Sequence, residues 1–174
     1  MIGLRPYQAH ESASLLCWID TEAALVQWAG HSFRWPLDQA QLDAYLAGAA
    51  GAPPTRLIWT AVDAGEIVGH VCLNQIDQHD RKATISRVLI APQARGRALC
   101  TPLIEAVLGV AFDELGLHRV DLATFDFNRP ALACYERAGF RLEGQLREDI
   151  LLGGEWWSTS LMSILEGEWR RQHP

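Results

Sequence analysis

The stretch that decides the fold reads Val88-Leu89-Ile90-Ala91-Pro92-Gln93-Ala94-Arg95-Gly96-Arg97-Ala98. It combines the end of an apolar strand, a short loop and the start of a helix. Backbone N–H groups in the first turn of a helix have no intrahelical partners and lie at the positive end of the helix dipole. Gly96 lets a ligand approach this backbone closely. The pattern therefore predicts a site for an anion such as pyrophosphate, although an ordinary strand-to-helix turn would explain it equally well in isolation.

Outward from this stretch, the chain alternates between strand and helix periodicity. The predicted strands span residues 2–7, 56–62, 67–77, 83–90, 119–127, 140–152 and 156–165. The predicted helices are a broken helix over 10–28, one that begins after Asp38, and those over 98–115 and 130–138, the last of which Asn128 could cap. Turns between strands are expected at Ala64-Gly65 and at Gly153-Gly154. We expect an α/β (α+β) fold with a mixed, mostly antiparallel twisted sheet of about seven strands and about four flanking helices.

Composition narrows the functional classes. With 174 residues, 49% of them hydrophobic, we expect a single domain over residues 1–174. The net charge of −6 argues against a nucleic-acid partner, and no apolar run long enough for a membrane span or an export signal is present, so we expect a cytoplasmic protein. The cysteines lack C-x-x-C spacing, which predicts no metal site and reduced, mostly buried thiols. They are Cys17, Cys72, Cys100 and Cys134.

Thirty residues beyond the loop the sequence reads Asn128-Arg129-Pro130-Ala131-Leu132-Ala133-Cys134-Tyr135-Glu136-Arg137-Ala138-Gly139-Phe140. Together, the loop and this segment resemble the GNAT superfamily of acetyl-CoA-dependent acetyltransferases. The resemblance implies the GNAT fold, whose sheet splays in the middle, and acetyl-CoA as cosubstrate with no metal. The cofactor-binding residues implied by it are Val88, Leu89, Ile90, Gln93, Ala94, Arg95, Gly96, Arg97, Ala98, Asn128 and Tyr135.

The resemblance also implies catalytic roles. Tyr135 would protonate the departing thiolate, although tyrosines on short helices are often only packed. Many family members carry a glutamate near Ser86 or Arg87, which this chain lacks. Glu148 and Asp149 lie on a predicted strand whose alternation sends them to opposite faces, so only one could face the cleft, and we expect Glu148 to act as general base. A backbone carbonyl acting through water remains an alternative, as do three histidines. They are His70, His79 and His118.

The last part of the chain is similar to the ribosomal-protein N-acetyltransferase (RimJ/RimL-like) branch. We therefore expect transfer of acetyl to a primary amine, either a protein N-terminus or a small molecule, by direct attack in a ternary complex. The alternative is a CoA-binding sensor without turnover. A homodimer is compatible with either reading. Several aromatic residues could line the acceptor side or pack the core: Trp28, Phe33, Trp35 and Tyr45.

Overall fold

The computed structural model describes residues 2–173, so the predicted domain limits at residues 1 and 174 lie outside the described part. The strands are β1 (Gly3–Pro6), β2 (Arg56–Asp63), β3 (Glu66–Asp77), β4 (Lys82–Ile90), β5 (Arg119–Phe125), β6 (Arg141–Leu152) and β7 (Glu155–Leu165). The α-helices are α1 (Ser12–Trp18), α2 (Glu22–Ala29), α3 (Gln39–Ala47), α4 (Cys100–Gly109), α5 (Arg129–Arg137) and α6 (Glu166–Gln172). Short 3-10 turns are η1 (Ala9–Glu11), η2 (Gly30–Ser32) and η3 (Pro92–Ala94), and the π-helical turn η4 (Val110–Glu114) continues α4.

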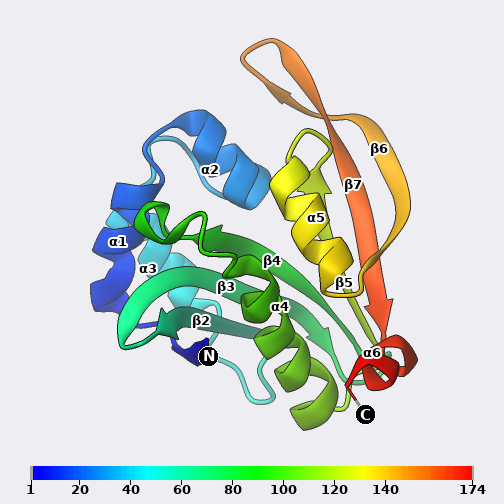
Figure 1. The fold of residues 1–174 in the computed structure, drawn as a ribbon. Coiled ribbons are helices and arrows are strands. Elements are labelled where there is room, and N and C mark those ends of the chain that lie inside the picture. The colour runs from blue at the N-terminus through cyan, green and yellow to red at the C-terminus, as the bar shows by residue number, and fades with distance from the viewer. Residues whose placement is uncertain (1, 174) are drawn as a thin grey trace.

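The seven strands form one twisted sheet in the order β1-β2-β3-β4-β5-β7-β6. The pairing of β4 with β5 is parallel, and the other neighbouring strands pair antiparallel. The β6–β7 hairpin extends beyond the rest of the sheet (Figure 1). The predicted mixed, mostly antiparallel sheet of about seven strands is confirmed.

Helices cover both faces of the sheet, with α4 and α5 on one face (Figure 1). Successive residues of β2 show why: Ile58 packs with the core under α1, α2 and α3, whereas Trp59 packs with the core under α4, α5 and α6. In β3, Cys72 and Leu73 divide in the same way. Because side chains alternate along a strand, two buried faces require nearly continuous apolar strands, as the central strands have.

The helix count differs from the expected four. The predicted broken helix is indeed interrupted, because Thr21 starts α2 by accepting a hydrogen bond from the Ala24 N–H at 3.1 Å. The helix α6 was not predicted. It begins where the Glu168 carboxylate accepts a hydrogen bond from the Leu165 N–H at 2.9 Å, and it buries Trp169.

The prediction of reduced, mostly buried thiols is wrong for two of the four cysteines, which form a disulfide. Cys100 and Cys134 form a disulfide between the first residue of α4 and α5, with their Cα atoms 6.1 Å apart. Cys17 is a free, exposed thiol, and Cys72 is free and buried. The two cysteines are 34 positions apart, and the sequence between them gave no indication of this pairing, because it depends on α4 and α5 lying side by side.

Candidate active site

The sheet opens between β4 and β5. Their parallel pairing runs only from Lys82↔Arg119 to Ile85↔Leu122. Beyond that point β5 continues along β7 as far as Phe125↔Thr159, while residues 86–90 of β4 are each half-buried instead of alternating. The two strands thus diverge, as expected of a splayed sheet.

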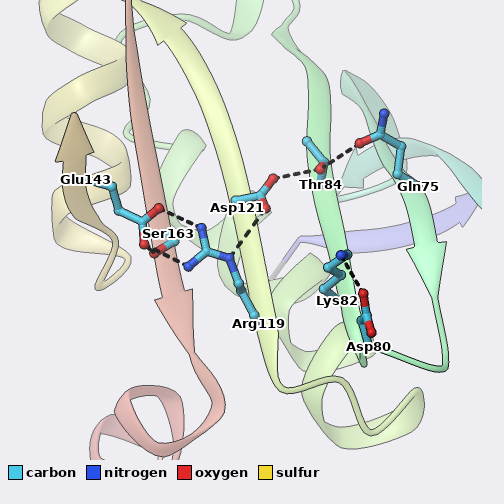
Figure 2. A network of polar contacts seen from close by, with 8 residues as sticks. All are labelled: Gln75, Asp80, Lys82, Thr84, Arg119, Asp121, Glu143 and Ser163. Carbon is cyan, nitrogen blue, oxygen red and sulfur yellow. Dashed lines mark hydrogen bonds and ion pairs between the residues drawn. The ribbon is translucent and has the colours of Figure 1, made fainter. Parts of the chain in front are cut away.

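A polar network holds the closed end of this opening (Figure 2). Across the last parallel pairs, the Thr84 hydroxyl donates to the Asp121 carboxylate at 2.6 Å. Arg119 donates two hydrogen bonds to Glu143, at 2.7 and 2.6 Å, and Ser163 adds a third at 2.6 Å. The bonds from Arg119 and Ser163 lower the pKa of Glu143 to about 2, so this carboxylate stays ionised near neutrality. The network links β4, β5, β7 and β6 directly below the point of divergence.

The open end contains a cavity of about 300 Å³. Its floor comes from residues 84–87 of β4 and 123–125 of β5, and its walls come from α2 with the turn after it, and from β6 and β7. The charged residues among the described lining are Arg87 and Asp149. Ser86 also lines it, so the β4 position where many family members carry glutamate faces the cavity with a hydroxyl.

A bulge in β4 shapes the cavity. Cys72 pairs with Ser86 but His70 pairs with Leu89, so Val71 stands opposite two residues of β4. Arg87, the first of these, has φ +53°, which is typical of such a bulge. The Trp28 indole N–H donates to the Arg87 carbonyl at 2.9 Å and fixes the bulge from α2. From here to Ile90 the edge of β4 turned toward β5 lacks a partner strand among the described residues, so its backbone groups are available to a ligand.

The loop after β4 continues this edge toward α4. Ala94 is buried, whereas the other predicted loop residues are exposed: Gln93, Arg95, Gly96, Arg97 and Ala98. Gly96 has φ +78°, and a Cβ placed on it would meet no protein atom within 4 Å. The open space beside this glycine fits a ligand that lies against the backbone. Arg97 is paired with Asp63 at 2.7 Å, and α4 begins at Cys100, two residues later than predicted.

The α5 segment lies next to this loop through the disulfide. Asn128 caps α5, its side-chain oxygen accepting from the Ala131 N–H at 3.3 Å, which confirms one of its two expected roles. Tyr135 is 6% exposed and packs within the core under α5. Burial raises the pKa of its hydroxyl well above the ordinary value, so the phenol keeps its proton near neutrality. Among the described residues that line the cavity, Tyr135 is not included.

The two candidate carboxylates of β6 point differently. The pairing of β6 with β7 shifts between Leu146 and Ile150, and Glu148 has φ +52° within this bulge. Glu148 is exposed, and its backbone N–H donates to the Ser158 hydroxyl at 3.1 Å. Asp149, not Glu148, lines the cavity.

Sequence reasoning did not single out Arg87 or Asp149 as cavity residues. Arg87 takes its place from a bulge held by Trp28, 59 residues away, and no local pattern signals that contact. For Asp149, the signal was the expectation that neighbouring strand residues face opposite sides, but the sequence analysis assigned the cleft to Glu148 instead, whereas Asp149 lines the cavity. His70 is buried on β3 and is not among the described lining residues, and His79 is exposed in the turn between β3 and β4.

Two negative findings complete the description. Within residues 2–173, no helix is both long and apolar enough to cross a membrane. The same residues contain no group of three or more His, Cys, Asp or Glu side chains arranged to hold a metal ion.

Comparison with known proteins places the chain in a family. A putative ribosomal N-acetyltransferase of Bacillus subtilis is 32% identical over 105 residues, covering 60% of this chain and 57% of that protein. The spermidine N(1)-acetyltransferase of Escherichia coli is 27% identical, covering 63% of this chain and 58% of that protein. The chain thus matches less than two thirds of the length of these curated relatives.

The fold has a close structural counterpart. The crystal structure of spermidine N-acetyltransferase from Vibrio cholerae in complex with CoA and spermine superposes with a TM-score of 0.85, at 22% identity, over 97% of this chain and 98% of that one. The sequence model of the acetyltransferase (GNAT) family matches residues 22–140, which is more than half of the chain and includes the cavity floor, the glycine loop and α5. The chain therefore belongs to the GNAT acetyltransferase family.

Proposed function

We propose that this protein transfers the acetyl group of acetyl-CoA to a primary amine, by direct attack in a ternary complex. One observation carries the proposal: the unpaired edge of β4 leads without interruption from the cavity to the glycine loop at the start of α4. The loop supplies backbone N–H groups suited to a pyrophosphate, and residues 88–90 supply backbone groups for an extended amide-containing arm. Acetyl-CoA supplies the activated thioester.

The open space beside Gly96 supports this assignment of the loop. Arg95 and Arg97 lie close by and are exposed, but Arg97 is paired with Asp63, so it would have to leave this ion pair to contact a phosphate. We therefore assign phosphate binding mainly to backbone N–H groups, with Arg95 as the more available cation.

For the chemical step, the amine must lose its proton before it attacks, and the departing thiolate must gain one. The place of Asp149 in the cavity supports it over Glu148 as the carboxylate that binds the ammonium group and accepts its proton, directly or through water. Paired variants separate the two: Asp149→Asn should lower kcat/KM, and Glu148→Gln should leave it within a few-fold of wild type. The reverse result would return the role to Glu148.

Tyr135 is our proposed general acid. The place of Tyr135 in the family's motif supports this role, and its hydroxyl carries a proton near neutrality, whereas the burial that raises its pKa makes it a weaker acid. Its side chain is also part of the core, so packing and proton donation must be separated by experiment.

A cavity of about 300 Å³ supports as acceptor either a small amine or the first residue of a polypeptide. The relatives of this chain include both a putative ribosomal N-acetyltransferase and a spermidine N(1)-acetyltransferase. We therefore assign the acceptor first as a primary amine, and treat a protein N-terminus, as in the RimJ/RimL-like branch, as one member of the test panel.

The deciding experiment measures release of free CoA thiol from acetyl-CoA with a panel of peptides with free N-termini, polyamines, amino acids and aminoglycosides. Acceptor-dependent release with at least one class would support the enzyme. Tight acetyl-CoA binding by calorimetry without release for any class would instead favour a CoA-binding sensor without turnover.

A further inference from the structure

Arg87 and Asp149 place one positive and one negative charge in the same cavity. The other described lining residues are neutral, and several are apolar, including Val26, Phe125 and Ile150. A site for a polycation would be expected to carry several carboxylates and no cation. The charge pattern suits a ligand that itself carries both signs.

The protein provides hydrogen-bond acceptors for only part of the Arg87 guanidinium. Its guanidinium lies over the rings of Tyr45 and Phe33, 4.9 and 5.5 Å from their centres. Nη1 donates a long hydrogen bond to the Ser86 hydroxyl at 3.3 Å, while Nε is buried without a hydrogen-bond partner. Within residues 2–173, no carboxylate forms an ion pair with it in the structure.

The position of the Arg87 guanidinium is unfavourable unless an anionic ligand binds to it. A partly buried cation without an anionic partner loses hydration, and Arg87 gains only two ring contacts and one long hydrogen bond in return. The bulge and the hydrogen bond from Trp28 nevertheless hold Arg87 at the cavity. Arg56 contacts the same Tyr45 ring at 5.5 Å, but its guanidinium donates to Asn74 at 3.0 Å and to the Tyr45 carbonyl at 3.3 Å. Of these two arginines, Arg87 is therefore the one with a buried hydrogen-bond donor that lacks a partner.

We infer that Arg87 binds a carboxylate of the acceptor, so that the substrate is a small zwitterion of the amino-acid type with an apolar body. Asp149 faces its ammonium group, and the apolar lining receives its side chain. This inference rests on the proposed function and restricts the acceptor from primary amines in general to amino-acid-like zwitterions. It disfavours polyamines, whose second cation would meet Arg87, and polypeptide N-termini, which lack a carboxylate next to the amine.

The test compares matched acceptors on the full-length protein at saturating acetyl-CoA. Leucine and leucinamide differ in the carboxylate alone, and the amide has the more acidic ammonium group, so simple amine reactivity favours leucinamide. We expect kcat/KM to be higher for leucine. Arg87→Met should reduce kcat/KM for leucine by about 10- to 100-fold, as expected for loss of a charge-assisted hydrogen bond, and change that for leucinamide by less than about 3-fold.

Arg56→Met is the matched control, because it removes an arginine from the same aromatic ring and Arg56 is not itself among the described lining residues, although it donates to the lining residue Asn74 at 3.0 Å. It should leave the ratio of leucine to leucinamide unchanged. Arg87→Lys should recover part of the preference, which a purely structural role would not require. Acetyl-CoA affinity, measured by calorimetry, should be the same in Arg87→Met and wild type.

Three results would overturn the inference. They are equal use of leucine and leucinamide by wild type, an equal loss with both acceptors in Arg87→Met, and weakened acetyl-CoA binding in that variant, which would assign Arg87 to the cosubstrate. Release of CoA with peptides or spermidine but not with leucine would refute the inference and leave the proposed function intact. Absence of release with every acceptor would count against both.

Discussion

His70 should make the stability of this protein depend on pH well above the range of its carboxylates. It lies on β3, is 1% exposed, and is surrounded by the rings of Tyr7, Trp28 and Tyr45. Nε2 lies 3.2 Å from the Tyr45 hydroxyl, and Nδ1 has no hydrogen-bond partner. Burial, together with the positive charge of Arg87, lowers the pKa of His70 to about 3. The folded protein therefore holds this imidazole neutral.

The sign and size of the effect follow from linkage. Below the ordinary histidine pKa of about 6.5, the unfolded chain binds a proton that the folded chain rejects, so stability falls as pH decreases. This contribution is fully present above that value and is lost progressively down to the folded pKa of about 3. Between pH 7 and pH 5 the free energy of unfolding should drop by about 2 kcal/mol. Carboxylates contribute little in this interval because their unfolded pKa values lie near 4.

Urea unfolding at pH 7, 6 and 5 measures this drop directly. We expect His70→Gln to remove most of the pH dependence, even if its stability at pH 7 is lower. His79→Gln changes an exposed histidine on the turn that follows β3 and should behave as wild type. A wild-type free energy of unfolding that is flat from pH 7 to pH 5 would refute the reasoning without any variant. If the free energy of unfolding of His70→Gln changes with pH as steeply as that of wild type, the effect belongs to another titrating group.

Further predictions concern the proposed site and the disulfide. Tyr135→Phe keeps the ring in the core and deletes the hydroxyl, so if this group is the general acid, kcat should fall by about 10²- to 10⁴-fold with little change in Tm. Steady-state kinetics at saturating acetyl-CoA test this, and turnover near wild type would remove Tyr135 from the mechanism. Gly96→Val fills the open space at the loop and should weaken acetyl-CoA binding by about 10-fold or more, measured by calorimetry. Gly65→Val is the control, since Gly65 also has a positive φ, of +86°, and open space around it, but lies in the β2–β3 turn; equal affinity loss in both variants would contradict the loop assignment. Reduction of the Cys100–Cys134 disulfide, which closes a loop of 34 residues, should lower the free energy of unfolding by about 2–4 kcal/mol. Urea unfolding with and without a thiol reductant measures the change, with the Cys17→Ser variant as a check that the free, exposed thiol is not responsible.

Local patterns were sufficient where one element follows another with a clear change of period. Apolar strands followed by Gly65 or by the Gly153-Gly154 turn predicted hairpins that the sheet contains. Asn128 was placed correctly as a helix cap because side-chain capping is decided within one turn of helix. The helix α6 was overlooked because Leu165 at its start has no side-chain oxygen to act as a cap, so only half of the capping-box pattern is present, in the bond from the Leu165 N–H to Glu168.

Reasoning from local patterns was wrong where a strand contains a bulge. Strand alternation assumes an unbroken register, but β4 and β6 each contain an irregularity, at Arg87 and at Glu148. The extra residue of a bulge changes the direction of a side chain, but it alters neither the composition nor the hydrophobic period of the strand. The sequence analysis therefore chose Glu148, whereas Asp149 lines the cavity, and it did not assign Arg87 to the cavity.

The sequence by itself determined the order of strands and helices, the glycine loop before α4, and the pair of motifs by which the GNAT family is recognised. These depend on neighbours a few residues apart, through hydrogen bonds within a turn and the alternation of apolar side chains. Only the tertiary structure decided the disulfide, the cavity between the diverging strands, and which charges line it. Those features join residues 34 to 62 positions apart, from Cys100 and Cys134 to Arg87 and Asp149, and arise only when helices and strands pack against one another.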